Sequence, residues 1–171
     1  MRMFIASPLK ITPGIESIVN ELSGNRNLRI TGLNNFHLTY LFLGEVDPRE
    51  SNRIVVNLEK IFSNKFRAKI SGITLFPDIY HPRIIVLILE SPFFNDIYNS
   101  ILRLLPEYQN SNREFLPHIT IARIRNGSVA PRVSKLAIPD ELISIDQLCL
   151  FKSVLTREGA VYERIYCNEF R

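Results

Sequence analysis

The sequence lacks tryptophan, contains only two cysteines and disperses seven glycines among its 171 residues. No G-x-x-x-x-G-K-[ST] motif occurs, which excludes a P-loop nucleotide site. No uninterrupted apolar run approaches the roughly 18 residues of a membrane span, so we expect no membrane association. Cys149 and Cys167 match no zinc-binding spacing, and two cysteines are too few for a disulfide framework. We therefore expect two reduced thiols and a cytoplasmic location.

Apolar residues make up 46% of the chain and charged residues 22%, a composition typical of globular proteins. The formal net charge of +4 favours anionic partners. No low-complexity or Gly/Ser-rich stretch marks a domain boundary, so we expect residues 1–171 to form a single domain. Nothing in the composition indicates an obligate protein partner.

Prolines separate short helices and strands along the whole chain. Helices are predicted to begin near Thr12, Asp47 and Ser91, because each of these capping residues is followed directly by a proline. Strands are predicted at seven places: Met3–Pro8, Phe36–Leu43, Phe66–Leu75, Arg83–Leu89, Ile119–Ile124, Gln147–Val154 and Val161–Cys167. Helices and strands do not alternate regularly, which indicates an α+β fold with helices packed against antiparallel sheets.

Two of the three histidines lie in the same local pattern, His-x-Thr within an apolar strand. Residues i and i+2 of a strand point to the same face, so His37 projects with Thr39 and His118 with Thr120. The alternate side chains of the first strand are expected to face a core: Phe36, Leu38, Tyr40 and Phe42. A lone histidine in a strand is usually structural, but the repeat of the whole pattern favours a functional pair. His81 lacks such a partner and is interpreted as a loop residue.

An imidazole beside a hydroxyl supplies a proton carrier and a hydrogen-bond donor for an anion. Two such strands facing each other would surround a phosphate, with one imidazole accepting a proton from water and the other protonating the leaving alkoxide. Arg123 follows His118 by five residues, an odd offset that requires a bulge or strand end before the guanidinium can clamp the same phosphate. Carboxylates are scattered and no H-x-x-x-H pair occurs, so we expect no metal and no cofactor.

The two motif segments, HLTYLFLGE from His37 and PHITIAR from Pro117, resemble the paired H-x-T signatures of the two-histidine (2H) phosphoesterases. Within that superfamily the chain is most similar to the LigT-like RNA 2′,3′-cyclic phosphodiesterases, historically called 2′-5′ RNA ligases. The similarity extends to Phe4–Ala6, to Gly72–Pro77 and to the closing strands near Leu150–Leu155 and Gly159–Tyr162.

The resemblance implies two pseudo-symmetric lobes, each an antiparallel sheet with outer helices, flanking a central cleft. It implies metal-independent hydrolysis of a 2′,3′-cyclic phosphate, on an RNA end or a small cyclic nucleotide, to a 2′-phosphate. His37 and His118 are then the catalytic residues, with His37 as general acid and His118 as general base. Thr39, Thr120 and Arg123 bind the substrate phosphate.

Two further features are consistent with an RNA substrate. Phe76 and Tyr80 precede Arg83 and could stack on a base, as aromatic residues do in proteins that bind single-stranded RNA, although a core position is the favoured interpretation of Phe76. Basic residues after the second motif offer either a solvated face or a track for RNA phosphates: Arg123, Arg125, Arg132 and Lys135.

Two alternatives stay open beside the phosphodiesterase. The same site could run the reaction backward as a 2′-5′ RNA ligase, with a 5′-hydroxyl in place of water. A non-catalytic module could instead bind RNA ends without turnover, although binding alone does not require two imidazoles.

Overall fold

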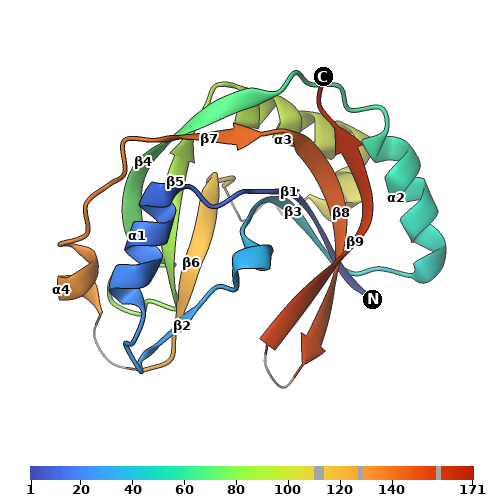
Figure 1. The fold of residues 1–171 in the computed structure, drawn as a ribbon. Helices are drawn as coiled ribbons and strands as arrows, with labels where there is room; N and C mark the ends of the chain where they lie inside the picture. The colour runs from blue at the N-terminus through green and yellow to red at the C-terminus, as the bar shows by residue number, and fades with distance from the viewer. Residues whose placement is uncertain (110–113, 127–128, 157–158) are drawn as a thin grey trace.

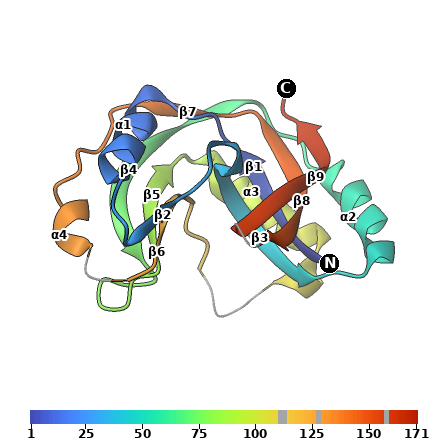
Figure 2. The same ribbon diagram turned by 60° about the horizontal axis from the view of Figure 1, so that its bottom comes forward.

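The computed structural model describes residues 1–109, 114–126, 129–156 and 159–171. Within these residues nine strands form one curled antiparallel sheet in the order β7-β4-β5-β6-β3-β1-β8-β9, and β2 pairs with β6 outside this path (Figures 1 and 2). The strands are β1 (Arg2–Pro8), β2 (Leu28–Ile30), β3 (His37–Glu45), β4 (Phe66–Phe76), β5 (Ile84–Glu90), β6 (His118–Ile124), β7 (Leu142–Ile145), β8 (Gln147–Thr156) and β9 (Gly159–Glu169).

The helices of the described residues lie beside both halves of this sheet. They are α1 (Pro13–Leu22), α2 (Ser51–Leu58), α3 (Phe93–Leu104) and α4 (Ala130–Val133), with 3₁₀ turns η1 (Leu33–Asn35), η2 (Pro48–Glu50) and η3 (Pro106–Tyr108). Figure 1 shows α1 and α4 beside one half of the sheet and α2 beside the other. None of these helices is long and apolar enough to cross a membrane.

The predicted α+β fold is confirmed. Its sheet consists of two antiparallel halves that follow each other in one continuous strand order. One half runs β6-β5-β4-β7 and the other runs β3-β1-β8-β9. A single residue pair, Leu38 with Ile119, joins β3 to β6 and so makes the two halves one continuous sheet. That residues 1–171 constitute a single domain stays a prediction.

Local sequence signals explain where the helices begin. Thr12 caps α1 by accepting a hydrogen bond from the Ile15 amide at 3.4 Å, and Pro13 occupies the first helical position. Asp47 accepts from the Arg49 amide at 2.8 Å but caps η2, so α2 begins three residues later than this cap predicts. The helices bury one apolar face each in the main core: Ile15, Ile18, Val19, Leu22, Ile54, Leu58, Phe94, Ile97 and Ile101.

A second, smaller apolar cluster occupies the opposite face of β1 and β8. Phe4, Ala6, Cys149 and Phe151 are buried there, and Tyr162 and Cys167 pack against them. This face also carries Thr39, because Thr39 lies directly opposite Ala6, and Ala6 directly opposite Cys149.

The expectation of two separate thiols is wrong, because Cys149 and Cys167 form a disulfide. The two cysteines are paired directly across β8 and β9, a relation that their sequence separation of 18 does not reveal. The compartment of the protein therefore stays a prediction without support from its cysteines.

Reduction of this disulfide should destabilise the protein. The chain-entropy model gives a cross-link closing a loop of this size about 3 kcal/mol of stabilisation. We expect urea unfolding with dithiothreitol to show a free energy of unfolding lower by about that amount. The Cys167→Ala variant, which cannot form the bond, should not respond to dithiothreitol. An unchanged midpoint in the wild type would contradict this role.

Candidate active site

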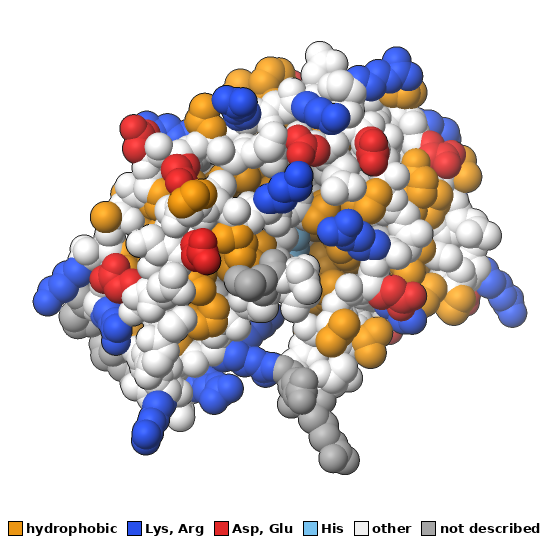
Figure 3. Space-filling model, viewed as in Figure 1, with side chains coloured by type: hydrophobic (Ala, Val, Ile, Leu, Met, Phe, Trp, Pro, Cys, Tyr) orange, Lys and Arg blue, Asp and Glu red, His pale blue; other side chains and the backbone are white. Residues whose placement is uncertain are grey.

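The two His-x-Thr motifs meet where the halves of the sheet join. Leu38 and Ile119 are the middle residues of the motifs and lie directly opposite each other in antiparallel strands. This register sets His37 across from Thr120 and Thr39 across from His118, with all four side chains on one face. Leu38 and Ile119 are fully buried on the other face. A hollow at the centre of the molecule, with a histidine visible in it, is seen in Figure 3.

Both histidines are oriented by the same local hydrogen bond. Nδ1 of His37 lies 2.5 Å from the Asn35 carbonyl oxygen, and Nδ1 of His118 lies 2.6 Å from the Leu116 carbonyl oxygen. A carbonyl oxygen only accepts, so Nδ1 carries the proton in each ring. Nε2 is thereby left in each imidazole to exchange a proton with a ligand.

A matching β-bulge follows each motif. Tyr40 is an extra residue in β3 relative to β1, and Ile121 is an extra residue in β6 relative to β5. A bulge of one residue reverses which face the following side chains point to. The bulge expected from the offset of Arg123 is therefore present.

Beyond the bulges, Phe42 and Arg123 occupy equivalent positions five residues after the two histidines. Arg123 is exposed on the face of His118, since its neighbour Ala122 is fully buried in the core. Phe42 was expected in the core, and this expectation is wrong. Its side chain is 64% exposed, and its ring lies 6.1 Å from that of Phe4, on the face of Thr39.

Aromatic rings surround His37 but not His118. The His37 ring centroid lies 5.1 Å from Phe4, 5.0 Å from Tyr162 and 6.3 Å from Phe151. Among the described residues, His118 has one ring contact, a stacked Phe76 at 5.7 Å. Sequence reasoning missed this aromatic cluster, because its members come from β1, β8 and β9 and share no local motif.

This environment changes the proton affinity of His37. Burial, together with the nearby positive charges of His118 and Arg123, lowers its pKa to about 4, against the opposing hydrogen bond to Asn35. His37 is therefore neutral at pH 7 in the free protein. The same electrostatic contributions indicate that His118 and Arg123 lie near His37.

The remaining candidates differ in how they relate to the two histidines. Phe76 packs on His118 and is 37% exposed, whereas Tyr80 is 82% exposed in the loop before β5. His81 lies beside Asp78 in that same loop, with its Nδ1 4.0 Å from the carboxylate. The Arg132 guanidinium donates to the Glu21 carbonyl at 2.7 Å, so this arginine belongs to a structural contact of α4.

The polar side chains of the site suit an anion better than a metal ion. Neither Thr39 nor Thr120 uses its hydroxyl in a protein hydrogen bond within the described residues. No group of three His, Cys, Asp or Glu side chains in that part of the chain could hold a metal ion. Two hydroxyls, two imidazoles and a guanidinium supply hydrogen-bond donors for phosphate oxygens.

The sequence is similar to a known family of phosphoesterases and to named members of it. Residues 5–86 match the family model described as LigT like phosphoesterase. An RNA 2′,3′-cyclic phosphodiesterase of Archaeoglobus fulgidus is 28% identical over 170 residues, covering 95% of this chain and 97% of the relative. A protein of the same name from Methanocaldococcus jannaschii is 26% identical over 174 residues, covering 96% and 98%.

Solved structures share the fold over nearly the whole chain. A structure from Thermus thermophilus superimposes with a TM-score of 0.86 at 22% identity, covering 99% of this chain and 97% of that chain. Apo LigT of E. coli superimposes with a TM-score of 0.74 at 21% identity, covering 99% and 96%. The curled sheet with its two equivalent halves is thus common to these proteins.

An anion bound between the histidines should raise the pKa of His37. The free ring has its pKa lowered to about 4, and a negative charge beside it favours the imidazolium. Proton NMR should show His37 titrating well below pH 6.5 in the free protein and at higher pH with saturating 2′-AMP. The exposed His81, in the loop before β5, is an internal control whose proton resonances 2′-AMP should leave in place. An ordinary titration of His37 near pH 6.5 without ligand would contradict the buried environment.

Proposed function

Because the chain belongs to the LigT-like phosphoesterase family, we propose that it hydrolyses 2′,3′-cyclic phosphates to 2′-phosphates without a metal ion. The observation that carries this proposal is the pairing of Leu38 with Ile119, which brings both His-x-Thr motifs to one face. The substrate is an RNA end or a small nucleotide bearing a 2′,3′-cyclic phosphate. Relatives that align along nearly the whole chain are named RNA 2′,3′-cyclic phosphodiesterases, which supports this choice of substrate.

In this reaction a water oxygen forms a bond to phosphorus while the bond from phosphorus to O3′ breaks. One imidazole takes a proton from the attacking water, and the other donates a proton to O3′ as it leaves. Thr39, Thr120 and Arg123 hold the phosphate oxygens, with the planar guanidinium able to bind two of them at once. Attack and departure occur on opposite sides of phosphorus, which two histidines on neighbouring antiparallel strands accommodate.

The acid and base must differ in protonation when the substrate is bound. The resemblance assigns His37 as the general acid, yet His37 is neutral in the free protein because its pKa is lowered to about 4. This role therefore depends on the cyclic phosphate, whose negative charge favours the imidazolium of His37 once it is bound. His118 then acts as the general base toward water.

Aromatic side chains support nucleotide binding beside the phosphate. Phe42 is exposed next to Phe4 on the face of Thr39, where its ring is available to a base. Bases stack on aromatic rings with little regard to sequence. Phe76 and Tyr80 stay proposals for the same task. Phe76 already stacks on His118, which favours a role in orienting that ring.

The purified protein should convert 2′,3′-cyclic AMP to 2′-AMP in excess EDTA. The two imidazoles supply the proton transfers that a metal-bound water would otherwise provide. Phosphorus NMR of the product identifies the broken bond. Loss of activity on chelation that a divalent cation restores would contradict the metal-independent mechanism, and a 3′-phosphate product would contradict cleavage at O3′. Tight binding of 2′-AMP without any turnover would favour the binding module.

Replacement of either histidine by alanine should lower kcat by roughly 10²–10⁴, the usual contribution of a positioned acid or base. Binding of 2′-AMP should survive, because Thr39, Thr120 and Arg123 still contact the phosphate. A substrate with sulfur in place of O3′ has a leaving group that needs no proton, so it should restore the His37→Ala variant but not His118→Ala. Restoration of His118→Ala instead would reverse the two roles. The matched control is His81→Ala, which should keep wild-type kcat.

A further inference from the structure

A second arginine lies beside Arg123 on the same face of the sheet. Arg29 in β2 is directly opposite Arg123 in β6. The pairs on either side, Leu28 with Ile124 and Ile30 with Ala122, pack in the main core. The two guanidinium-bearing side chains therefore both project away from the core, onto the face that carries the histidines.

This arrangement of like charges is unfavourable without an anion. Directly opposed side chains have Cβ atoms roughly 5 Å apart, and like charges at that separation destabilise a sheet. Among the described residues, no Asp or Glu forms an ion pair with Arg29 or Arg123. Phosphate oxygens bound at the two guanidinium groups would offset the repulsion.

The end of the β8–β9 hairpin holds Arg29 in place. A Cβ atom at position 159 would lie 2.7 Å from Cζ of Arg29, so the guanidinium packs directly on the backbone of Gly159. Gly159 has a φ of +120°, which only glycine adopts readily. Asn35 of η1 donates to the Ala160 carbonyl at 3.3 Å and fixes the same end of the hairpin. Figure 3 shows Lys and Arg side chains gathered in this region, at the lower centre of the molecule.

We propose that Arg29 binds the phosphodiester that joins the terminal nucleotide to the rest of an RNA chain. This assignment rests on the proposed function, in which the terminal cyclic phosphate lies between His37 and His118. Arg123 lies toward that phosphate, and Arg29 lies one strand away, at the end of the site bounded by β2 and the hairpin. The protein therefore distinguishes a polynucleotide end from a mononucleotide by one additional phosphate contact.

Binding measurements test this without requiring turnover. Fluorescence anisotropy with an RNA trinucleotide ending in a 2′-phosphate should show about tenfold weaker binding to Arg29→Gln than to the wild type. The slope of log K against log salt should become shallower by about 0.7, as expected for one lost phosphate contact on a single strand. Binding of 2′-AMP, which lacks that phosphodiester, should change less than about twofold.

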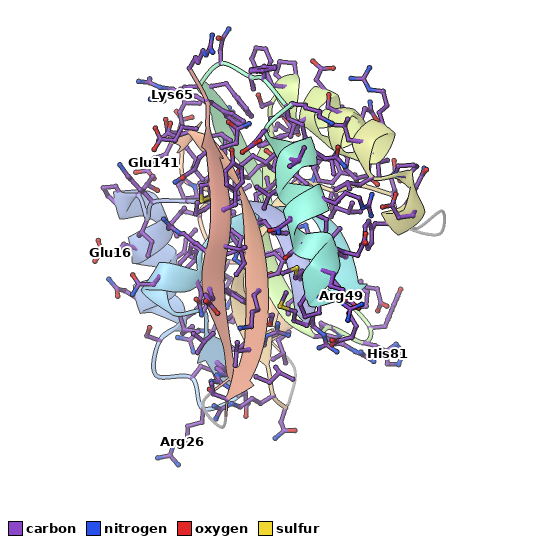
Figure 4. The ribbon with its side chains drawn as sticks, turned by 90° about the vertical axis from the view of Figure 1, so that its right-hand side faces the viewer. Glu16, Arg26, Arg49, Lys65, His81 and Glu141 are labelled. Atoms are coloured by element: carbon purple, nitrogen blue, oxygen red, sulfur yellow. A yellow bond between two sulfur atoms is a disulfide. The ribbon has the colours of Figure 1, made fainter. Side chains whose placement is uncertain are left out.

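Three variants serve as controls. Arg49→Gln removes the same charge from an exposed residue beside α2 (Figure 4) and should bind both ligands like the wild type. Arg123→Gln should weaken both ligands. Circular dichroism verifies that each variant folds, and Arg29→Lys, which keeps the charge and the stem, should retain most of the salt dependence.

The outcomes separate this inference from the function it rests on. Equal weakening of both ligands by Arg29→Gln, or no weakening of either, would overturn the assignment of Arg29. A wild-type protein that binds the trinucleotide in the expected way but hydrolyses no cyclic phosphate would overturn the proposed function and leave the Arg29 contact established.

Discussion

The pairing of Leu38 with Ile119 is the interaction on which both the sheet and the site depend. It is the only described pair between β3 and β6, so it alone makes one sheet from two halves. Both side chains are fully buried, and a register slip of one residue would bring histidine and threonine into the core in their place. The cost of burying these polar groups fixes the register, and the same register places His37 and His118 on one face.

The bulges at Tyr40 and Ile121 determine what else reaches that face. Without them, position five after each histidine would point into the core, where a guanidinium could not be accommodated. The two halves use this equivalent position differently, with Phe42 in one and Arg123 in the other. Repetition of the backbone thus brings the two histidines together, and divergence at one side chain gives an apolar surface on one side and a cation on the other.

The parts of the site that depend on local spacing could be predicted from the sequence, and those that depend on register could not. Strand alternation correctly grouped His37 with Thr39, and the odd offset of Arg123 correctly required a bulge. The corresponding bulge before Phe42 left no such sign, because a phenylalanine fits a core as well as a surface. The disulfide and Arg29 were missed for a related reason, since their partners are set by pairing between strands distant in sequence.

Two imidazoles in identical surroundings would gain and lose protons together, which is of no use to a reaction that needs one acid and one base. The unequal distribution of aromatic rings breaks this equivalence. Phe4, Phe151 and Tyr162 enclose His37 and make its imidazolium costly in the free protein. A negative charge bound between the motifs would oppose that preference by favouring the imidazolium. Under the proposed function, the apolar cluster on β1, β8 and β9 would therefore couple the protonation of His37 to occupancy of the site, so that the proton needed at O3′ is held when there is a phosphate to receive it.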